Sequence, residues 1–275
     1  MSIWLKISQK LGFQAYNDFR TPCEAIDFGV KNGFKCVELN GTHPCFFPEN
    51  IKDSDRRAIK EAPIDVLMHA PADISLFSLH KNISNASVAR LKEFIDFVIE
   101  CNIKNLTVHI GSTFRVALGE KITYIHEVLP ELFKEALKRN LQELVNYSLK
   151  KSYRISIENA GGFRYQISHE VLEEFLKQEK IYLTWDIGHT NTLINRPAEY
   201  QIELTLFKKY KHLIREVHLH DNKGNEDEHN VIGKGNVNFE GYRELLINTP
   251  EFYVLEVRPK ERAIESKRII ESKLI

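Results

Sequence analysis

Residues 154–158, Arg-Ile-Ser-Ile-Glu, show the pattern that decides the fold: a short β-branched run that ends in an ionisable side chain. A loop and a stretch of helical periodicity follow, and this order recurs along the chain. The runs are near-continuous rather than cleanly alternating, which indicates strands that are covered on both faces. The eight candidate strands are Ile3–Ser8, Lys35–Leu39, Ile64–His69, Asn105–His109, Arg154–Glu158, Ile181–Asp186, Ile214–Leu219 and Phe252–Glu256.

The stretches between these runs predict helices. Thr21-Pro22-Cys23-Glu24 combines an N-cap, a proline at the first helical position and a capping-box glutamate. A longer helix is expected from Ile125 to Leu149, and the last helix from Ala263 to about Leu274. A further helix, ending near Asn102, carries an apolar stripe at helical spacing, formed by Val88, Leu91, Phe94, Ile95, Val98 and Ile99.

Eight strand–helix pairs predict an α/β protein with a single (β/α)8 TIM barrel. The chain has 275 residues, and such barrels typically take about 250. No break in composition divides the chain, so residues 1–275 are expected to form one domain. A doubly wound sheet is the alternative, but no glycine-rich phosphate loop follows the first run.

Charge and composition exclude several classes of protein. The 38 Lys and Arg balance 38 Asp and Glu, which excludes nucleic-acid binding through bulk positive charge but not through a local basic groove. No apolar stretch is long enough for a membrane span, and the N-terminus has no signal-peptide pattern. The four cysteines form no C-x-x-C pair, so reduced thiols in a soluble, cytoplasmic protein are expected.

Ionisable residues at the strand ends are the main functional signal. Because the carboxyl ends of barrel strands meet on one face, these residues are expected to share a pocket. His189 follows the end of the sixth run by three residues. Asp227 and His229 lie in a later loop, and their i, i+2 spacing in extended backbone would direct both side chains to the same side. The seven residues at the strand ends are Glu38, His69, His109, Glu158, Asp186, His218 and Glu256.

This set of side chains predicts a metal centre. A single polar residue at a strand end is usually solvated or hydrogen-bonded, but so many carboxylates and imidazoles in one pocket would repel one another or shift their pKa values. Bound divalent cations remove that cost. Without a thiolate, the mixture favours Zn²⁺, with Mn²⁺ or Fe²⁺ as alternatives. His220 is the alternative to His218 as the ligand on the seventh run, and the remaining histidines, His80, His126, His169 and His212, are expected at the surface.

These residues are where the sequence resembles the xylose isomerase-like TIM-barrel superfamily and, within it, endonuclease IV (AP endonuclease family 2). The resemblance covers most of the chain. Its motifs are Met68-His69-Ala70-Pro71, Val108-His109-Ile110-Gly111, Ile157-Glu158-Asn159, Asp186-Ile187-Gly188-His189, His218-Leu219-His220-Asp221, Asp227-Glu228-His229, Gly233-Lys234-Gly235-Asn236 and Leu255-Glu256.

The resemblance to endonuclease IV implies a zinc-dependent hydrolase of DNA repair that cleaves phosphodiesters at abasic sites with a metal-bridging hydroxide. Glu158 and Glu256 would be catalytic, and two or three Zn²⁺ ions would bind. By the resemblance, the first ion would lie on His69, His109 and Glu158, the second on Glu158, Asp186, His218 and Glu256, and the third on His189, Asp227 and His229.

The same superfamily contains metal-dependent sugar and sugar-phosphate isomerases and epimerases. In that alternative, one metal lies on Glu158, Asp186, His218 and Glu256, and the two glutamates exchange a proton beside a carbonyl. Ala72 and Asp73 favour it, because endonuclease IV places an aromatic and a large aliphatic residue there to enter the duplex. The loop from Asn40 to Pro48 also resembles the isomerases.

The hydrolase is the preferred interpretation because it employs all nine ligands. A third possible class of protein is a barrel that binds metal without catalysis. It is disfavoured because so many ionisable groups directed into one pocket indicate a chemical reaction rather than metal storage. The partner is therefore abasic DNA or a small sugar or sugar phosphate. Residues expected to contact that substrate are Glu38, His43, His220, Lys223, Lys234 and Arg258.

Overall fold

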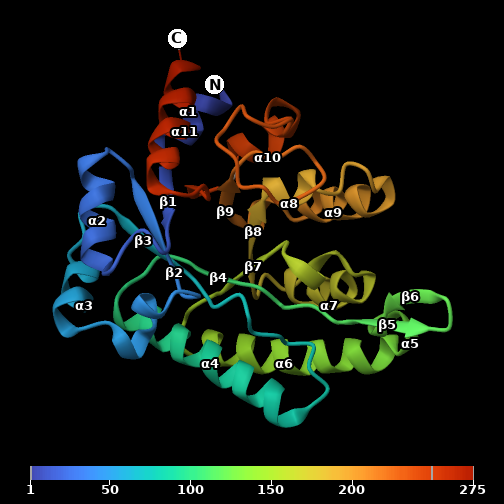
Figure 1. The fold of residues 1–275 in the computed structure, drawn as a ribbon. Coiled ribbons are helices and arrows are strands. Elements are labelled where there is room, and N and C mark those ends of the chain that lie inside the picture. The colour runs from blue at the N-terminus through green and yellow to red at the C-terminus, as the bar shows by residue number, and fades with distance from the viewer. Residues whose placement is uncertain (1, 249, 275) are drawn as a thin grey trace.

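The computed structural model describes residues 2–248 and 250–274, and eight of its strands form a closed parallel barrel (Figure 1). Around the barrel, each strand pairs with its neighbour in the order β1-β2-β3-β4-β7-β8-β9-β10, and β10 closes on β1. The barrel strands are β1 (Leu11–Ala15), β2 (Cys36–Asn40), β3 (Asp65–His69), β4 (Leu106–Val108), β7 (Ser156–Glu158), β8 (Tyr182–Asp186), β9 (Ile214–Leu219) and β10 (Phe252–Leu255). The predicted (β/α)8 barrel is therefore confirmed.

Helices cover the outside of the barrel, and the ends of the described chain lie side by side, where α1 packs against α11 (Figure 1). The predicted apolar stripe of α4 is buried from Val88 to Val98, whereas Ile99 is exposed. The helices are α1 (Ile3–Gln9), α2 (Pro22–Lys31), α3 (Asp53–Lys60), α4 (Lys81–Glu100), α5 (Ile125–Val128), α6 (Pro130–Lys150), α7 (Gln166–Leu176), α8 (Ile187–Asn191), α9 (Pro197–Lys209), α10 (Arg243–Asn248) and α11 (Lys260–Ser272).

The first strand lies later in the chain than the sequence pattern predicts. Residues Ile3–Ser8 form most of helix α1, because Ile3 and Ile7 are spaced to share one helical face and Ser2 caps the helix by accepting a bond from Trp4 N. The strand is β1, which begins at Leu11. A side chain at Gly12 would place a Cβ 2.4 Å from the Cys36 carbonyl oxygen, so this close strand pairing requires glycine.

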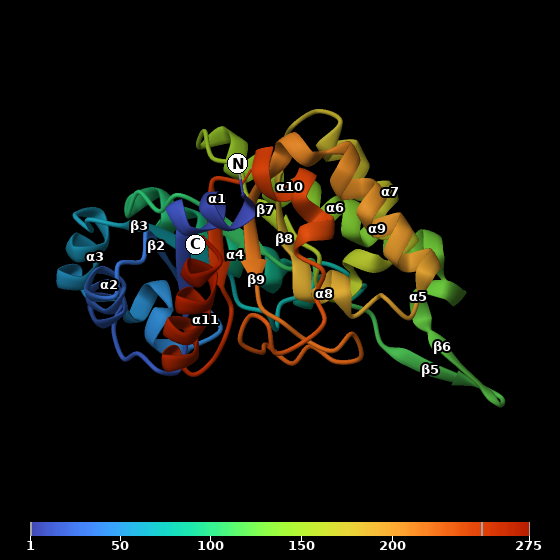
Figure 2. The ribbon, with the colours of Figure 1, turned by 90° about the horizontal axis from the view of Figure 1, so that it is seen from above.

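The long helix predicted from Ile125 is also divided. Helix α5 ends at Val128, and Pro130 begins α6, because proline fits the first turn of a helix but cannot continue one. Before α5, an unpredicted hairpin of β5 (Arg115–Leu118) and β6 (Lys121–Tyr124) turns at Gly119 and projects from the barrel (Figure 2).

The barrel interior changes from apolar to polar along its axis. Cys36, Leu67, Phe252 and Val254 form a separate apolar cluster near the amino ends of the strands. Beyond it lie buried polar side chains, where Thr107 bonds Thr184 and Asn105 bonds Glu216. The ionisable strand-end residues follow, so the barrel directs them to one end.

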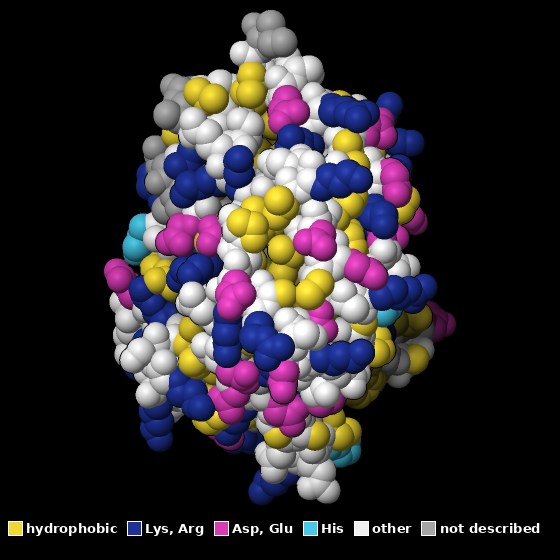
Figure 3. Space-filling model, turned by 90° about the vertical axis from the view of Figure 1, so that its left-hand side faces the viewer, with side chains coloured by type: hydrophobic (Ala, Val, Ile, Leu, Met, Phe, Trp, Pro, Cys, Tyr) yellow, Lys and Arg dark blue, Asp and Glu magenta, His cyan; other side chains and the backbone are white. Residues whose placement is uncertain are grey.

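On the surface, basic and acidic side chains are interspersed over the face of the molecule shown in Figure 3, in keeping with the zero net charge of the chain.

Candidate metal centre

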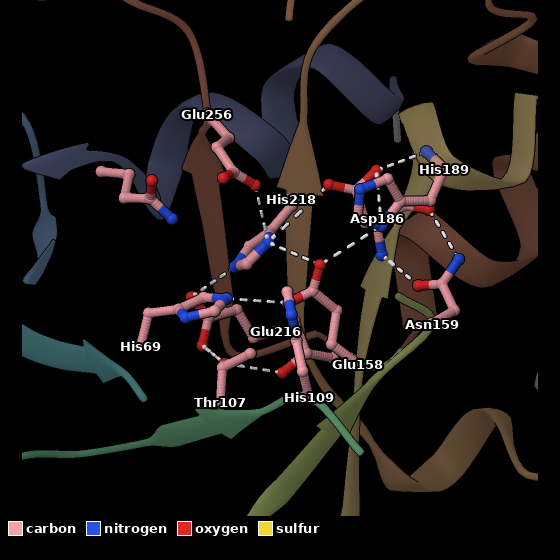
Figure 4. Close-up of polar contacts among 12 residues, drawn as sticks. His69, Thr107, His109, Glu158, Asn159, Asp186, His189, Glu216, His218 and Glu256 are labelled. Atoms are coloured by element: carbon pink, nitrogen blue, oxygen red, sulfur yellow. Dashed lines mark hydrogen bonds and ion pairs between the residues drawn. The ribbon is translucent and has the colours of Figure 1, made fainter. Parts of the chain in front are cut away.

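The structure brings all nine predicted ligands together at the carboxyl ends of the strands. Figure 4 shows the residues of the first two groups and His189. The first group is formed by His69 at the end of β3, His109 just after β4 and Glu158 at the end of β7. Oxygen Oε2 of Glu158 lies 3.0 Å from Nε2 of His69 and 2.8 Å from Nε2 of His109. Nδ1 of His69 lies 2.6 Å from the Ala70 carbonyl oxygen, which directs Nε2 toward the group.

The second group shares Glu158 and adds Asp186, His218 and Glu256, and all four residues are buried. Nδ1 of His218 lies 3.1 Å from Oε2 of Glu256, 3.7 Å from Oε1 of Glu158 and 3.8 Å from Oδ2 of Asp186. Among the described residues, neither Asp186 Oδ2 nor His218 Nδ1 has a hydrogen-bond partner. Buried polar atoms are rarely left unpaired, so this set of donors fits a bound cation.

The third group is centred on Asp227 in the loop after β9. Its Oδ2 lies 2.9 Å from Nε2 of His229 and 3.2 Å from Nε2 of His189, as the resemblance implies. His220 also joins this group, because its Nε2 lies 3.3 Å from Asp227 Oδ1. His218 and His220 therefore lie in different groups, although they are only two residues apart.

Electrostatic coupling links the groups in the metal-free chain. Burial alone would lower the pKa of His69 and of His229, but the neighbouring carboxylates outweigh it and raise each pKa to about 9. Burial works to raise the pKa of Glu158, yet His109 and His218 hold it well below its usual range. In the metal-free chain, protonated imidazoles thus balance the negative charge of the carboxylates. Bound divalent cations would otherwise balance that charge.

The metal groups line a cavity of about 200 Å³ that opens at the end of the barrel. Arg258 lies at this mouth, as predicted, and donates to Glu256 Oε1 at 3.1 Å and to Gln14 Oε1. Tyr16 and Thr42 also line the cavity and were not predicted from the sequence.

The other predicted substrate contacts lie outside the cavity lining. Glu38 is buried deeper in the barrel, where Gln14 donates to it at 2.9 Å. His43 is half-buried with Nδ1 2.9 Å from Cys45 Sγ. Lys223 and Lys234 are exposed in the loop after β9 and do not line the cavity.

Two histidines expected at the surface are buried, and that prediction is wrong. His126 stacks on Tyr165 with ring centroids 3.8 Å apart, and its Nδ1 lies 2.6 Å from the Thr113 hydroxyl. His169 packs edge-on against Phe163, and burial lowers its pKa to about 4. Both imidazoles serve as flat, partly apolar groups in the outer layer of the barrel.

Comparison with known proteins identifies the family. The chain belongs to the family described as xylose isomerase-like TIM barrel, whose sequence profile matches residues 26–273. It is 30% identical to the uncharacterized protein MJ1311 of Methanocaldococcus jannaschii over 253 residues, which are 86% of this chain and 79% of that one. It is 27% identical to a probable endonuclease 4 of Petrotoga mobilis over 212 residues, covering 72% of this chain and 71% of that one.

Among solved structures, a D-tagatose 3-epimerase-like protein superposes with a TM-score of 0.72 at 23% identity, covering 96% of this chain and 97% of that one. This likeness concerns the fold. Members of the family are enzymes and include endonuclease IV and sugar epimerases. No helix among the described residues has the length and apolar character that crossing a membrane requires.

Proposed function

We propose that this protein is a zinc-dependent phosphodiesterase that cleaves DNA beside abasic sites. The observation that carries the proposal is the position of Glu158. Its Oε2 faces His69 and His109, while its Oε1 lies 3.7 Å from His218 Nδ1 and 3.3 Å from His189 Nδ1. One buried carboxylate thus contacts all three groups, as a bridging ligand in a multinuclear centre does.

The donor set fits divalent zinc, because imidazole nitrogens and carboxylate oxygens are its usual ligands when no thiolate is present. His69, His109 and Glu158 would hold one ion, Asp186, His218 and Glu256 a second with Glu158, and His189, Asp227 and His229 a third. When bound, such ions lower the pKa of water and neutralise charge on the oxygens of a phosphoester.

The chain's own residues supply the positioning. Glu158 is fixed between the first two groups, so it would orient the attacking water toward the cavity. Arg258 faces the same cavity and is held by Gln14 and Glu256, which aims a guanidinium at a phosphate oxygen of the substrate. Asp227 and His229 also line the cavity, and they would face the leaving oxygen.

A sugar or sugar-phosphate isomerase or epimerase is the second candidate, and two observations favour it. The cavity of about 200 Å³ suits a small molecule better than a duplex. Ala72 and Asp73 are exposed, and they offer neither an apolar wedge nor a positive charge to DNA. In this function, Glu158 and Glu256 would exchange a proton next to a carbonyl, and the groups on His109 and Asp227 would have no necessary role.

The deciding experiment is incubation of zinc-loaded protein with a duplex that contains one abasic site, beside the same duplex without the lesion. We expect incision of the damaged strand only, with loss of incision in the His109→Ala variant. If excess wild-type enzyme produces no incision, the proposed function is wrong.

A parallel assay tests the second candidate with a panel of ketoses and their phosphates in deuterated water. Deuterium incorporation at a carbon next to the carbonyl, abolished by Glu256→Gln but retained in His109→Ala, would establish the isomerase instead. His109 is the discriminating residue because it lies outside the four-residue group that both functions use.

A further inference from the structure

The imidazole of His218 has carboxylates on both sides. Its Nδ1 faces the second metal group, with Glu256 nearest. Its Nε2 faces the barrel interior, where it lies 3.4 Å from Oε2 of Glu38 and 3.5 Å from Oε1 of Glu216. All three side chains are fully buried. Figure 4 shows Glu216 on the side of His218 away from Glu256.

The two inner carboxylates are held in place by side-chain amides that donate to their Oε2 atoms. Asn105 Nδ2 donates to Glu216 Oε2 at 2.6 Å, and Gln14 Nε2 donates to Glu38 Oε2 at 2.9 Å. Among the described residues, Glu38 Oε1, Glu216 Oε1 and His218 Nε2 have no hydrogen-bond partner. Buried polar atoms are normally paired, and a proton on His218 Nε2 would face the unpaired Glu216 Oε1 at 3.5 Å and Glu38 Oε2 at 3.4 Å.

We infer that Glu38 and Glu216 are positioning residues for His218, which accept its Nε2 proton and leave the Nδ1 lone pair facing the second metal group. The inference rests on the metal dependence in the proposed function. A ligating histidine usually donates its other ring N–H to an acceptor that fixes the tautomer and ring orientation and raises the basicity of the ligand.

Two other histidines of the centre, His69 and His229, make the contrast clear. Nδ1 of His69 and Nδ1 of His229 each lie against a neutral main-chain carbonyl, at 2.6 Å and 2.8 Å. His218 instead faces two carboxylates, one from β2 and one from its own strand β9. Negative acceptors polarise an imidazole more strongly than neutral ones do. His218 is therefore expected to be a more strongly donating imidazole than His69 or His229.

The test is zinc binding by metal-free protein, measured by competition with a chromophoric chelator, for the variants Glu38→Gln and Glu216→Gln and for the double variant. Glutamine keeps the shape and one acceptor oxygen but removes the charge. We expect affinity at the second group to fall about 10- to 100-fold, with the number of bound ions unchanged at saturation. Thr184→Val is the matched control, because Thr184 belongs to the same interior layer but bonds only Thr107 there.

Nitrogen-15 NMR of histidine-labelled, zinc-loaded protein gives a second readout, which loss of stability alone would not change. We expect His218 to be protonated at Nε2. A proton at Nδ1 of His218 overturns the inference, and so does unchanged zinc affinity in the folded double variant. Neither result affects the proposed function. Loss of one ion at saturation in the double variant would replace the inference with a cation site among these side chains. If the wild-type protein binds no zinc, the inference and the proposed function both fail.

Discussion

The side-chain amide of Asn159 clamps the main chain of Asp186: its Oδ1 accepts from the Asp186 N–H at 2.7 Å, and its Nδ2 donates to the Asp186 carbonyl at 2.9 Å. The clamp joins the carboxyl ends of β7 and β8. Since Asn159 follows Glu158 directly, its bonds to Asp186 fix the distance between Glu158 and Asp186, which both belong to the second group. Nδ2 also donates to Glu203 at 3.0 Å, which ties helix α9 to the same point.

Replacing Asn159 with alanine should therefore lower both stability and metal affinity. We expect the free energy of unfolding of the metal-free protein to fall by about 1–3 kcal/mol, because several buried hydrogen bonds are lost together. Urea denaturation measures this change, and chelator competition measures zinc affinity. Gln142→Ala is the control, since it removes one exposed bond on α6 and should cost less than about 0.5 kcal/mol. Equal losses in the two variants would contradict the clamp.

The number of bound ions should depend on which group is altered. Wild-type protein dialysed against zinc should retain about three ions per chain, one for each group. His109→Ala removes a ligand found only in the first group, and His229→Ala removes one found only in the third. Each variant should lose about one ion by elemental analysis of the metal. A single ion in the wild type, unaffected by either substitution, would favour the isomerase.

Much of the fold could be predicted because parallel barrel strands are covered on both faces and therefore form continuous apolar runs. That rule fails at the N-terminus, where Ile3–Ser8 has the composition of a strand but the spacing of a helical face. It fails again at Leu11–Ala15, where Gly12 is a poor strand former that close packing requires, and Gln14 is a polar residue that bonds Glu38 in the polar interior.

The site was predictable where a residue lies at a strand end, and less so where it lies inside the barrel. Glu216 in the middle of β9 has the appearance of an outward-facing polar residue, and only its i, i+2 relation to His218 places it on the inner face. His220 shows the opposite problem: it shares that parity with His218, but the loop that carries Asp227 draws it into the third group.

The buried His169 should by itself make the fold less stable in mild acid. An unfolded histidine has a pKa of about 6.5, and burial lowers the pKa of His169 to about 4. Below pH 6.5 the unfolded chain therefore binds a proton that the folded chain binds only near pH 4. The free energy of unfolding should fall by about 1.4 kcal/mol per pH unit within this window on account of this residue.

This dependence can be isolated by substitution. His169→Phe removes the titrating group while keeping a ring against Phe163, so its stability should vary less steeply between pH 6.5 and 4.5 than that of the wild type. Urea denaturation at several pH values gives the comparison. His212→Gln serves as the control, because His212 is exposed. If His169→Phe shows the same slope as the wild type, the neutral buried imidazole is excluded.

Asp73 should oppose DNA binding if DNA is the substrate. The residue is exposed in the loop after β3, close to Ala72 at the cavity. Asp73→Arg should tighten binding to an abasic duplex several-fold at low salt. The slope of log affinity against log salt concentration should also become steeper, by the amount that about one additional phosphate contact contributes. Fluorescence anisotropy across a salt series measures both. Asp65→Arg makes the same charge change at the opposite end of β3, and it should have a smaller effect. Equal effects would indicate non-specific attraction only.

Zinc should stabilise the fold, because it replaces the protons that balance the carboxylates of the three groups. An ion that binds only the folded chain adds about 2.7 kcal/mol at a free concentration one hundred times its Kd. The Tm of chelator-treated protein should therefore rise as free zinc increases. Glu158→Gln should remove most of this rise, since Glu158 contacts all three groups. Glu226→Gln alters an exposed acid next to Asp227 and should keep the rise in full. A Tm that does not respond to zinc in the wild type would show that these side chains are balanced by protons alone.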